Sequence, residues 1–263
     1  MKKLIKTTFL VLAIFLLSCE KDYIFTPLTD GVLLKEVYFG DNLSYVYTYN
    51  DARQVLENKS KWSYTKYNYS KNRLISHDLY FDNRIFSSSG YILEDAMKRT
   101  EWVNPQNTEK EATLEYFYNG NKLVKSTMLH GYSTYSYDSS NRINRQTFHE
   151  DDGKETGYID FFYDAKGNMI KRLHYSVSSK GETTLNTTTI YEFDNKNNPY
   201  RAFSSLMIPG ENTNPNNIVK ETYTLHFEVD DFIEKVQVKE FSYEYNSKGY
   251  PISKNKEIKF TYY

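Results

Sequence analysis

Hydrophobic and polar residues alternate in short runs along most of the chain. In residues 222–229, for example, Tyr223, Leu225 and Phe227 fall at every second position, and threonine, histidine and glutamate residues lie between them. Side chains two positions apart share one face of an extended strand. The alternation therefore predicts half-buried β-strands rather than helices.

From residue 45 onward, this alternation is organised as an imperfect repeat. Each copy has an aromatic residue, any residue, a second aromatic residue and Asp, Asn or Ser, followed by a short polar turn and an aliphatic residue. The Asp or Asn can bond to its own backbone and so begins a turn, and Gly167 and Gly249 supply a positive φ where two turns need one. Each copy therefore predicts a β-hairpin. Seven copies begin at Tyr47, Tyr67, Tyr116, Tyr135, Phe161, Tyr191 and Tyr243.

Two degenerate copies, near Tyr80 and Leu225, fill the longest gaps between these seven. Seven to nine hairpins correspond to about 14–18 consecutive strands. We therefore predict that residues 32–263 form a single all-β domain. Its expected architecture is an antiparallel up-and-down meander of about 14–18 strands, either a curled sheet or a closed barrel.

The regular pattern is interrupted at three places. The stretch from Ile208 to Asn217, with its prolines and asparagines, predicts a long loop. Between Val238 and Phe241 the alternation slips by one residue, which predicts a bulge or turn near Lys239-Glu240. A short helix is predicted around residues 93–98.

The N-terminus has the features of a secretory signal peptide over residues 1–18. Three lysines precede an apolar run from Phe9 to Leu17. That run is shorter than the roughly 20 apolar residues of a transmembrane helix and suits the hydrophobic core of a signal sequence. The segment Leu16-Leu17-Ser18-Cys19 that follows resembles the lipobox of bacterial lipoproteins.

The lipobox resemblance implies that Cys19 is the lipidation site. Its thiol would receive a diacylglycerol, the signal would be cut before it, and the new amine would carry a further acyl chain such as palmitate. Two or more chains anchor a protein stably, so residues 19–31 would form a lipidated tether to the membrane. Lys21-Asp22 resembles the surface-export signal of Bacteroidota lipoproteins, which favours the surface over the periplasmic face of the outer membrane.

The repeat itself resembles the YD repeat of Rhs-type and teneurin shells. The combination of lipobox, aromatic hairpins and the segment Asn197-Asn198-Pro199-Tyr200, with Asn216 to Lys220 beyond it, is similar to a group of Bacteroidota cell-envelope lipoproteins. This second resemblance covers nearly all of the mature chain. It implies a β-meander with a porin-like, lipid-anchored fold and no assigned activity.

Composition narrows the function further. Removing residues 1–18 takes away three of the 33 basic residues and changes the formal charge from −1 to −4. A mildly acidic surface of mixed charge offers no electrostatic footprint for nucleic acid. Cys19 is the single cysteine and only five histidines are present, so we expect no disulfide framework, no metal site and no cofactor.

Acidic clusters fit solvated turns better than metal sites. His149 to Gly153 combines metal-capable side chains but lacks the alternating spacing of a calcium loop. We interpret it as a hairpin tip, and Asp230-Asp231 in the same way.

Histidines and motifs give no sign of catalysis. We expect His174 and His226 to be exposed strand residues, and His77 and His130 are equally isolated in sequence. The chain has no Gly-x-Ser-x-Gly, His-Glu-x-x-His or phosphate-loop motif. The sequence therefore predicts no enzyme and no catalytic residues.

Aromatic residues are abundant, with 26 Tyr and 16 Phe. Rows of tyrosine can stack on sugars or peptides. Their recurrence at one place in every unit instead favours a structural role in cross-strand pairing. A binding site is expected where regularity breaks, at Asn104 to Lys110 or in the loop from Ile208 to Asn217.

Three functions remain open. We favour a monomeric, non-catalytic cell-envelope lipoprotein with a structural role or a role in binding a glycan, a peptide or a partner protein. The second is an outer-membrane β-barrel pore ending in the aromatic Tyr263, since an apolar face can meet either a core or lipid. A mean hydropathy of −0.70 speaks against it. The third is a hydrolase with a site built from loops. Such a site needs two carboxyl groups at a particular distance in space, and that distance is not encoded in a sequence motif.

Overall fold

The computed structural model describes residues 31–81, 102–206, 208–228 and 234–263. These ranges form one 17-stranded sheet and two short 3₁₀ helices, so the predicted all-β meander is confirmed. The strands are β1 (Leu34–Phe39), β2 (Asn42–Tyr49), β3 (Val55–Ser60), β4 (Ser63–Ser70), β5 (Arg73–Phe81), β6 (Lys110–Asn119), β7 (Lys122–Thr127), β8 (Tyr132–Tyr137), β9 (Ile143–His149), β10 (Glu155–Tyr163), β11 (Met169–Val177), β12 (Thr183–Asn197), β13 (Asn216–Leu225), β14 (Val236–Glu240), β15 (Tyr243–Tyr245), β16 (Pro251–Lys254) and β17 (Ile258–Tyr262). The helices are η2 (Pro199–Leu206) and η3 (Glu211–Thr213).

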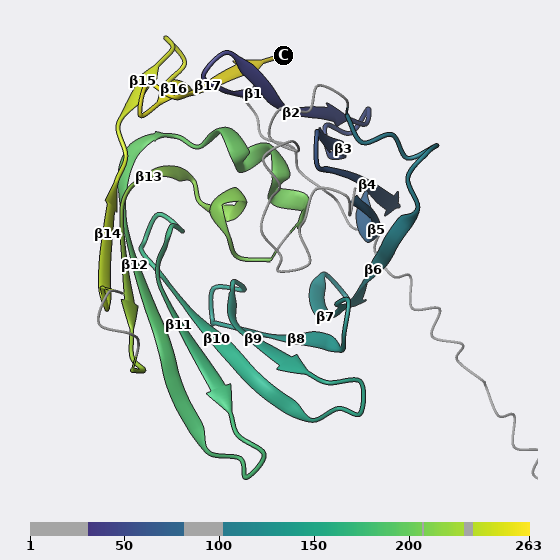
Figure 1. Ribbon diagram of the computed structural model, residues 1–263, viewed down its shortest axis with the longest axis vertical. Coiled ribbons are helices and arrows are strands. Elements are labelled where there is room, and N and C mark those ends of the chain that lie inside the picture. Colours follow the sequence, from purple (N-terminus) through teal and green to yellow (C-terminus); the bar gives the residue numbers. More distant parts are fainter. Residues whose placement is uncertain (1–30, 82–101, 207, 229–233) are drawn as a thin grey trace, which may run out of the picture.

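The sheet curls round into a ring (Figure 1). Consecutive strands pair antiparallel from β1 to β14 and again from β15 to β17, and β1 also pairs with β17, with Val37 opposite Phe260. Both β14 and β15 are described, but β14 pairs with β13, β15 pairs with β16, and no residue pairs join β14 to β15. Of the two predicted forms, the structure is therefore the curled sheet, with one seam.

The seam explains the slip in the alternation. β14 pairs with β13, and β15, two residues later, pairs with β16. The irregularity predicted near Lys239-Glu240 lies slightly further on, at Phe241 and Ser242, where the chain changes its pairing partner.

The predicted hairpins share one irregularity. In all seven copies the ladder register shifts between the middle residue and the second aromatic residue. In β10 and β11, for example, Tyr163 lies opposite Met169 while Phe162 lies opposite Lys171, so Ile170 is left over as a bulge. Bulges increase the local twist of a strand, which helps the sheet to curl.

Turns follow the chemistry expected from the sequence. The Asp164 carboxylate accepts hydrogen bonds from the backbone N–H groups of Lys166 (2.9 Å) and Asn168 (2.8 Å). Gly167 and Gly249 have φ angles of +92° and +77°, as predicted. In these turns the conformation is therefore encoded by residues close together in the sequence.

A row of tyrosine hydroxyls ties neighbouring strands together. In five copies the hydroxyl of the second aromatic residue donates to the backbone carbonyl of an aliphatic residue at the start of the neighbouring strand, at distances between 2.6 and 2.9 Å. Each such bond contributes about 1 kcal/mol to stability. The pairs are Tyr49 with Leu34, Tyr69 with Val55, Tyr118 with Leu74, Tyr137 with Leu123, and Tyr163 with Ile143.

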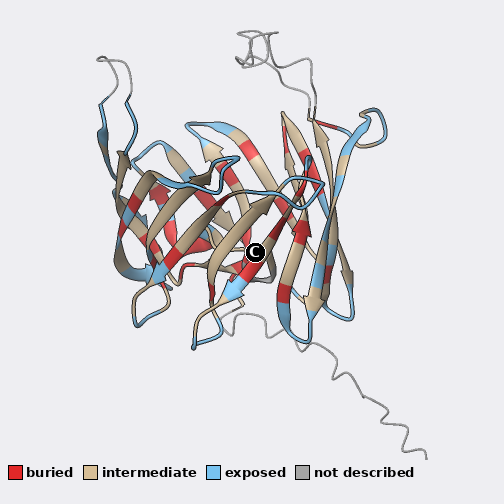
Figure 2. Ribbon diagram, turned by 90° about the horizontal axis from the view of Figure 1, so that it is seen from below, coloured by how far each residue is buried: buried red, intermediate tan, exposed pale blue. Residues whose placement is uncertain are grey.

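The core lies inside the ring. Buried positions recur along the strands (Figure 2), and the first aromatic residue of several copies is among them. Tyr47 belongs to one buried cluster with Phe203 and Phe260, and Tyr135 and Phe161 belong to a second. The structural role predicted for the aromatic motif is consistent with this packing.

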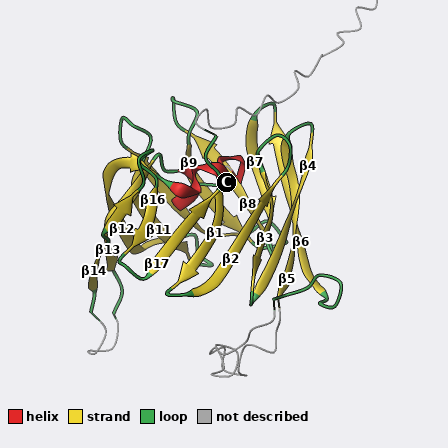
Figure 3. Ribbon diagram, turned by 90° about the horizontal axis from the view of Figure 1, so that it is seen from above, coloured by secondary structure: helices red, strands yellow, loops and turns green. Residues whose placement is uncertain are grey.

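The inner segment, defined here as residues 198–217, lies inside the ring and contains η2 and η3 (Figures 1 and 3). Phe203 packs on Tyr47 with ring centroids 4.8 Å apart, and Asn198 and Asn214 are buried. The stretch expected to be a long loop, Ile208 to Asn217, contains η3 and the first two residues of β13, and the remaining half is irregular.

Several predicted features lie outside the described residues. They are the signal peptide over residues 1–18, Cys19 with nearly all of the tether, the short helix at 93–98 and Asp230-Asp231. Among the described residues, the structure contains no helix with the length and hydrophobicity of a transmembrane span.

Candidate functional site

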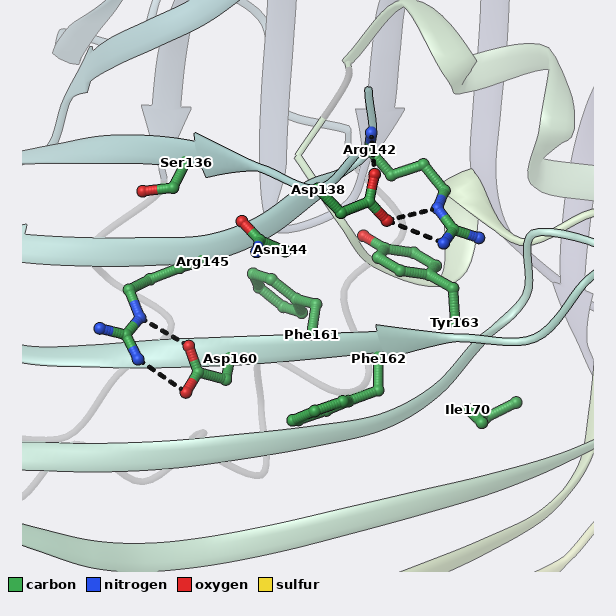
Figure 4. Close-up of a pocket in the computed structure, with 10 residues that line it drawn as sticks. All are labelled: Ser136, Asp138, Arg142, Asn144, Arg145, Asp160, Phe161, Phe162, Tyr163 and Ile170. Atoms are coloured by element: carbon green, nitrogen blue, oxygen red, sulfur yellow. Dashed lines mark hydrogen bonds and ion pairs between the residues drawn. The ribbon is translucent and has the colours of Figure 1, made fainter. Parts of the chain in front are cut away.

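A groove of about 750 Å³ lies on the outer side of strands β8 to β11 (Figure 4). Its outward position follows from the alternation: Asp160 and Phe162 flank Phe161, which is buried in the inner cluster. The lining residues are Ser136, Asp138, Arg142, Asn144, Arg145, Asp160, Phe161, Phe162, Tyr163 and Ile170.

Two ion pairs lie on either side of Phe161 and Phe162 (Figure 4). Arg145 donates to both carboxylate oxygens of Asp160, from Nε at 2.6 Å and from Nη2 at 2.9 Å. Arg142 donates from Nε to Asp138 at 2.8 Å. Both carboxylates therefore have a cationic partner, and the groove carries no net charge.

Electrostatics keep these groups ionised. Backbone hydrogen bonding from Arg142, together with the side-chain ion pair, lowers the pKa of Asp138. The carboxylate of Asp160 raises the pKa of Arg145. The guanidinium of Arg145 also lies 3.9 Å from the ring centroid of Tyr158, which in turn stacks on Tyr175 at 4.7 Å.

The groove also offers neutral and apolar contacts. The side-chain oxygen of Asn144 is buried and accepts no hydrogen bond from the described residues. Phe162 is 41% exposed, and Ile170 lies beside it on the next strand. Ser136 is exposed on β8. The groove therefore combines an exposed aromatic ring and an aliphatic side chain with polar groups.

This groove was not anticipated from the sequence, although a signal exists. The middle residue of each aromatic motif points outward, and in most copies it is polar. In Phe161-Phe162-Tyr163 and Tyr116-Phe117-Tyr118 it is phenylalanine instead. Outward-facing phenylalanine in an otherwise polar position marks these two places.

A second cavity, of about 200 Å³, lies between the inner segment and the wall of the ring. Glu211 from η3 and Lys254 from β16 approach each other there at 3.9 Å. The predicted site region from Ile208 to Asn217 therefore contributes Glu211 and Asn217 to an internal cavity. The other predicted region, Asn104 to Lys110, contributes to neither of these two cavities.

The histidines are in different environments. The strand register places His174 opposite Ile159, on the inward face, where burial lowers its pKa. The expectation that His174 is an exposed strand residue is thus corrected, because its neighbours Leu173 and Tyr175 are the outward pair. His226 is exposed as expected. Burial also lowers the pKa of His77, whose Nδ1 lies 2.9 Å from the Tyr116 hydroxyl.

The acidic turn at His149 to Gly153 connects β9 and β10, and residues 150–153 are exposed at its tip. Within the described ranges, no three His, Cys, Asp or Glu side chains gather into a metal-binding group. His130 is exposed in the turn after β7.

No protein-family model and no curated protein matches the chain. Among solved structures, a porin-like protein from Bacteroides uniformis is similar with a TM-score of 0.43 and 13% identity, over 88% of this chain and 96% of that one. A protein with unknown function from Bacteroides fragilis is similar with a TM-score of 0.19 and 14% identity, over 63% and 81%. A TcdB2-TccC3 structure is similar with a TM-score of 0.28 and 13% identity, over 77% of this chain and 10% of that one. TM-scores this low carry no information about function.

Proposed function

We propose that this protein is a lipid-anchored, non-catalytic protein of the cell envelope that binds a neutral glycan in the outer groove. Its acyl anchor at Cys19 would hold it to the outer membrane, and the folded sheet would stand in water as a monomer. The observation that carries the proposal is the exposed ring of Phe162 in a groove whose charged side chains are already paired with one another.

The chemistry of the groove favours a sugar. Sugar rings stack on aromatic faces, and their hydroxyls suit amide, hydroxyl and carboxylate partners. In each of the two ion pairs, Arg145–Asp160 and Asp138–Arg142, the two charges neutralise each other, so an ionic ligand would gain little binding energy in the groove. A neutral, hydroxyl-rich ligand fits better.

The outward face argues against the pore. Arg145–Asp160 and Glu192–Lys220 are cross-strand ion pairs on the outer side of the sheet. An Arg or Lys facing lipid near the bilayer midplane costs about 2–4 kcal/mol. The inner segment also occupies the space that a pore would need, which supports a water-facing protein with a filled interior.

The carboxylates of the groove argue against a hydrolase. Glycosidases of the common kind need one carboxylic acid whose pKa is raised, so that it can protonate the leaving group. The pKa of Asp138 is lowered instead, and Asp160 is held by a bidentate arginine. This supports binding rather than cleavage.

A glycan array tests the proposal with the full chain in a polyoxyethylene detergent, which carries no sugar headgroup. We expect binding to a neutral glycan that Phe162→Ala weakens by about fivefold, since stacking on an aromatic ring contributes about 1 kcal/mol. The matched control is Phe117→Ala, because Phe117 is 44% exposed at the same motif position but lies outside the groove.

The two variants separate the outcomes. Equal loss of binding in both variants would mean that the effect comes from the sheet surface in general, and it would contradict the proposal that the glycan binds in the outer groove. Absence of binding to every neutral glycan on the array would contradict the ligand class.

A further inference from the structure

The internal cavity between the inner segment and the wall contains one ion pair, in which Glu211 from η3 and Lys254 from β16 lie 3.9 Å apart. It is lined by Pro199, Tyr200, Glu211 and Asn217 from the inner segment and the start of β13, and by Phe39, Tyr243, Lys254, Ile258 and Phe260 from the wall. Its volume of about 200 Å³ exceeds the roughly 150 Å³ that is enough to admit benzene. The space is suited to a small molecule rather than to a polymer.

The Glu211 carboxylate accepts no hydrogen bond from any described residue. Its one charged partner is the ammonium of Lys254 at 3.9 Å, which is beyond hydrogen-bond distance. Burial raises the pKa of Glu211, Lys254 partly offsets this, and the like charge of Glu221 raises the pKa further. About half of the Glu211 side chain is accessible (51%), and Glu211 lines the cavity, so the side chain borders that space.

Lys254 is held in place without a hydrogen-bond acceptor. Its ammonium lies 4.2 Å from the ring centroid of Phe241 and 5.7 Å from that of Tyr243. An ammonium has three donors and normally bonds to oxygen. No described residue accepts from this one, so its donors are available to a ligand.

Tyr200 adds a neutral polar group. Its hydroxyl makes no hydrogen bond with the described residues, while its ring packs against Phe203 and Phe260 with centroids 5.8 and 6.4 Å away. The cavity thus presents a carboxylate, an ammonium and a hydroxyl on an aromatic wall, and none of the three makes a hydrogen bond to a described residue.

We propose that this cavity binds a small zwitterion such as a free α-amino acid. The ligand's ammonium would bond to Glu211, its carboxylate to Lys254 and the Tyr200 hydroxyl, and its side chain would lie on the aromatic wall. The site is separate from the outer groove and does not depend on the glycan proposal.

A zwitterion satisfies both charges, whereas a single ion does not. A cation placed at Glu211 would be repelled by Lys254, and an anion placed at Lys254 would be repelled by Glu211. Phe39 lies at the end of β1 and is 46% exposed, so the cavity reaches the open end of the ring there and offers a route of entry.

Isothermal titration of the full chain in the same detergent tests this proposal. The probes are glycine, L-leucine and L-phenylalanine, together with 3-methylbutylamine and 4-methylpentanoate, which are leucine without its carboxylate and without its amine. We expect at least one amino acid to bind. The amine and the acid should bind about tenfold to a hundredfold more weakly than leucine, because each lacks one charged hydrogen-bond partner.

Two variants locate the site. Glu211→Gln and Lys254→Met should each weaken amino-acid binding by a similar factor. The matched controls are Glu192→Gln and Lys220→Met, which break an ion pair of 3.3 Å on the outer face, and they should leave the affinity unchanged.

Three results would overturn the proposal. They are no binding by any amino acid at millimolar concentration, equal binding by leucine and its amine, and equal loss in the cavity and control variants. In the first case the cavity holds water only. Circular dichroism and the thermal midpoint of each variant show whether it is folded, and a Glu211→Asp variant provides a second test if Glu211→Gln unfolds.

Discussion

The backbone N–H and C=O groups find different hydrogen-bond partners in the wall of the ring and in the inner segment. In the wall, hairpin ladders, Asp or Asn turns and tyrosine ties repeat from copy to copy. Before β13 begins at Asn216, the described residues of the inner segment form no ladder, and asparagine amides take its place. Asn198 donates to the carbonyls of Glu211 and Asn214, and Asn214 accepts from the backbone N–H of Met169 on the wall.

In the wall, each ladder or tyrosine tie involves two neighbouring strands. In the inner segment, one side chain stabilises contacts with several strands. Each tie in the wall joins one pair of neighbouring strands, so we expect its loss to leave the ties of the other four copies intact. The inner segment depends on a few buried side chains that contact several strands at once. We therefore expect large effects from changes in the inner segment and small ones from changes in the wall.

The largest effect is expected from Phe203→Ala. Phe203 is 7% exposed and contacts the rings of Tyr47, Tyr49 and Tyr200. Removing a buried phenylalanine ring typically costs about 3–5 kcal/mol. Urea unfolding monitored by far-ultraviolet circular dichroism measures this, and a loss below 1 kcal/mol would mean that the inner segment is not part of the core.

A second, intermediate effect is expected from Asn214→Ala. The change removes the acceptor for the Met169 N–H at 2.8 Å and leaves that buried group unpaired. An unsatisfied buried donor costs about 1–3 kcal/mol. The same unfolding assay applies, and hydrogen exchange at the Met169 amide should quicken in the variant. An unchanged exchange rate at the Met169 amide would contradict the hydrogen bond from Met169 to Asn214.

Removing one tyrosine tie should have a smaller effect. Tyr49→Phe deletes the 2.7 Å bond to the Leu34 carbonyl and should lower the free energy of unfolding by about 1 kcal/mol. The matched control is Tyr158→Phe, since the Tyr158 hydroxyl makes no hydrogen bond with the described residues. Equal costs in both variants would show that the tie contributes nothing of its own.

The smallest effect, and one that depends on pH, is expected from Asp164→Asn. Burial favours a higher pKa for Asp164, but hydrogen bonds from Asn168 and from backbone N–H groups outweigh it and lower the pKa. The stability due to the charge is therefore present above the ordinary Asp pKa of about 3.9 and is lost as the pH falls through the lowered folded value.

Unfolding of wild type and Asp164→Asn across a pH series measures that contribution. We expect wild type to be more stable at neutral pH and the difference to fade in acid. A difference that grows as the pH falls would have the wrong sign for a lowered pKa.

The sequence predicted the wall well because its information is local. The alternation, the Asp164 turn and the positive φ of Gly167 all follow from residues close together in the chain. The aromatic face was therefore assigned correctly to packing, and the number of strands fell within the predicted range.

The inner segment and both cavities depend on contacts between distant residues. Glu211 meets Lys254 across 43 positions and Asn214 meets Met169 across 45, and no short pattern encodes such a meeting. His174 was assigned to the wrong face because Leu173 and Tyr175, although apolar or aromatic, point outward. Phe162 was the one local signal of the groove, at a motif position that is usually polar.

The central claim is that the sheet stands in water and that only the lipid anchor at Cys19 holds the protein to a membrane. Its most direct test uses the chain without residues 1–19 in detergent-free buffer, with size-exclusion chromatography, light scattering and far-ultraviolet circular dichroism. The account predicts a soluble, β-rich monomer. Aggregation that only detergent relieves, with a folded sheet recovered in micelles, would contradict it and favour the pore.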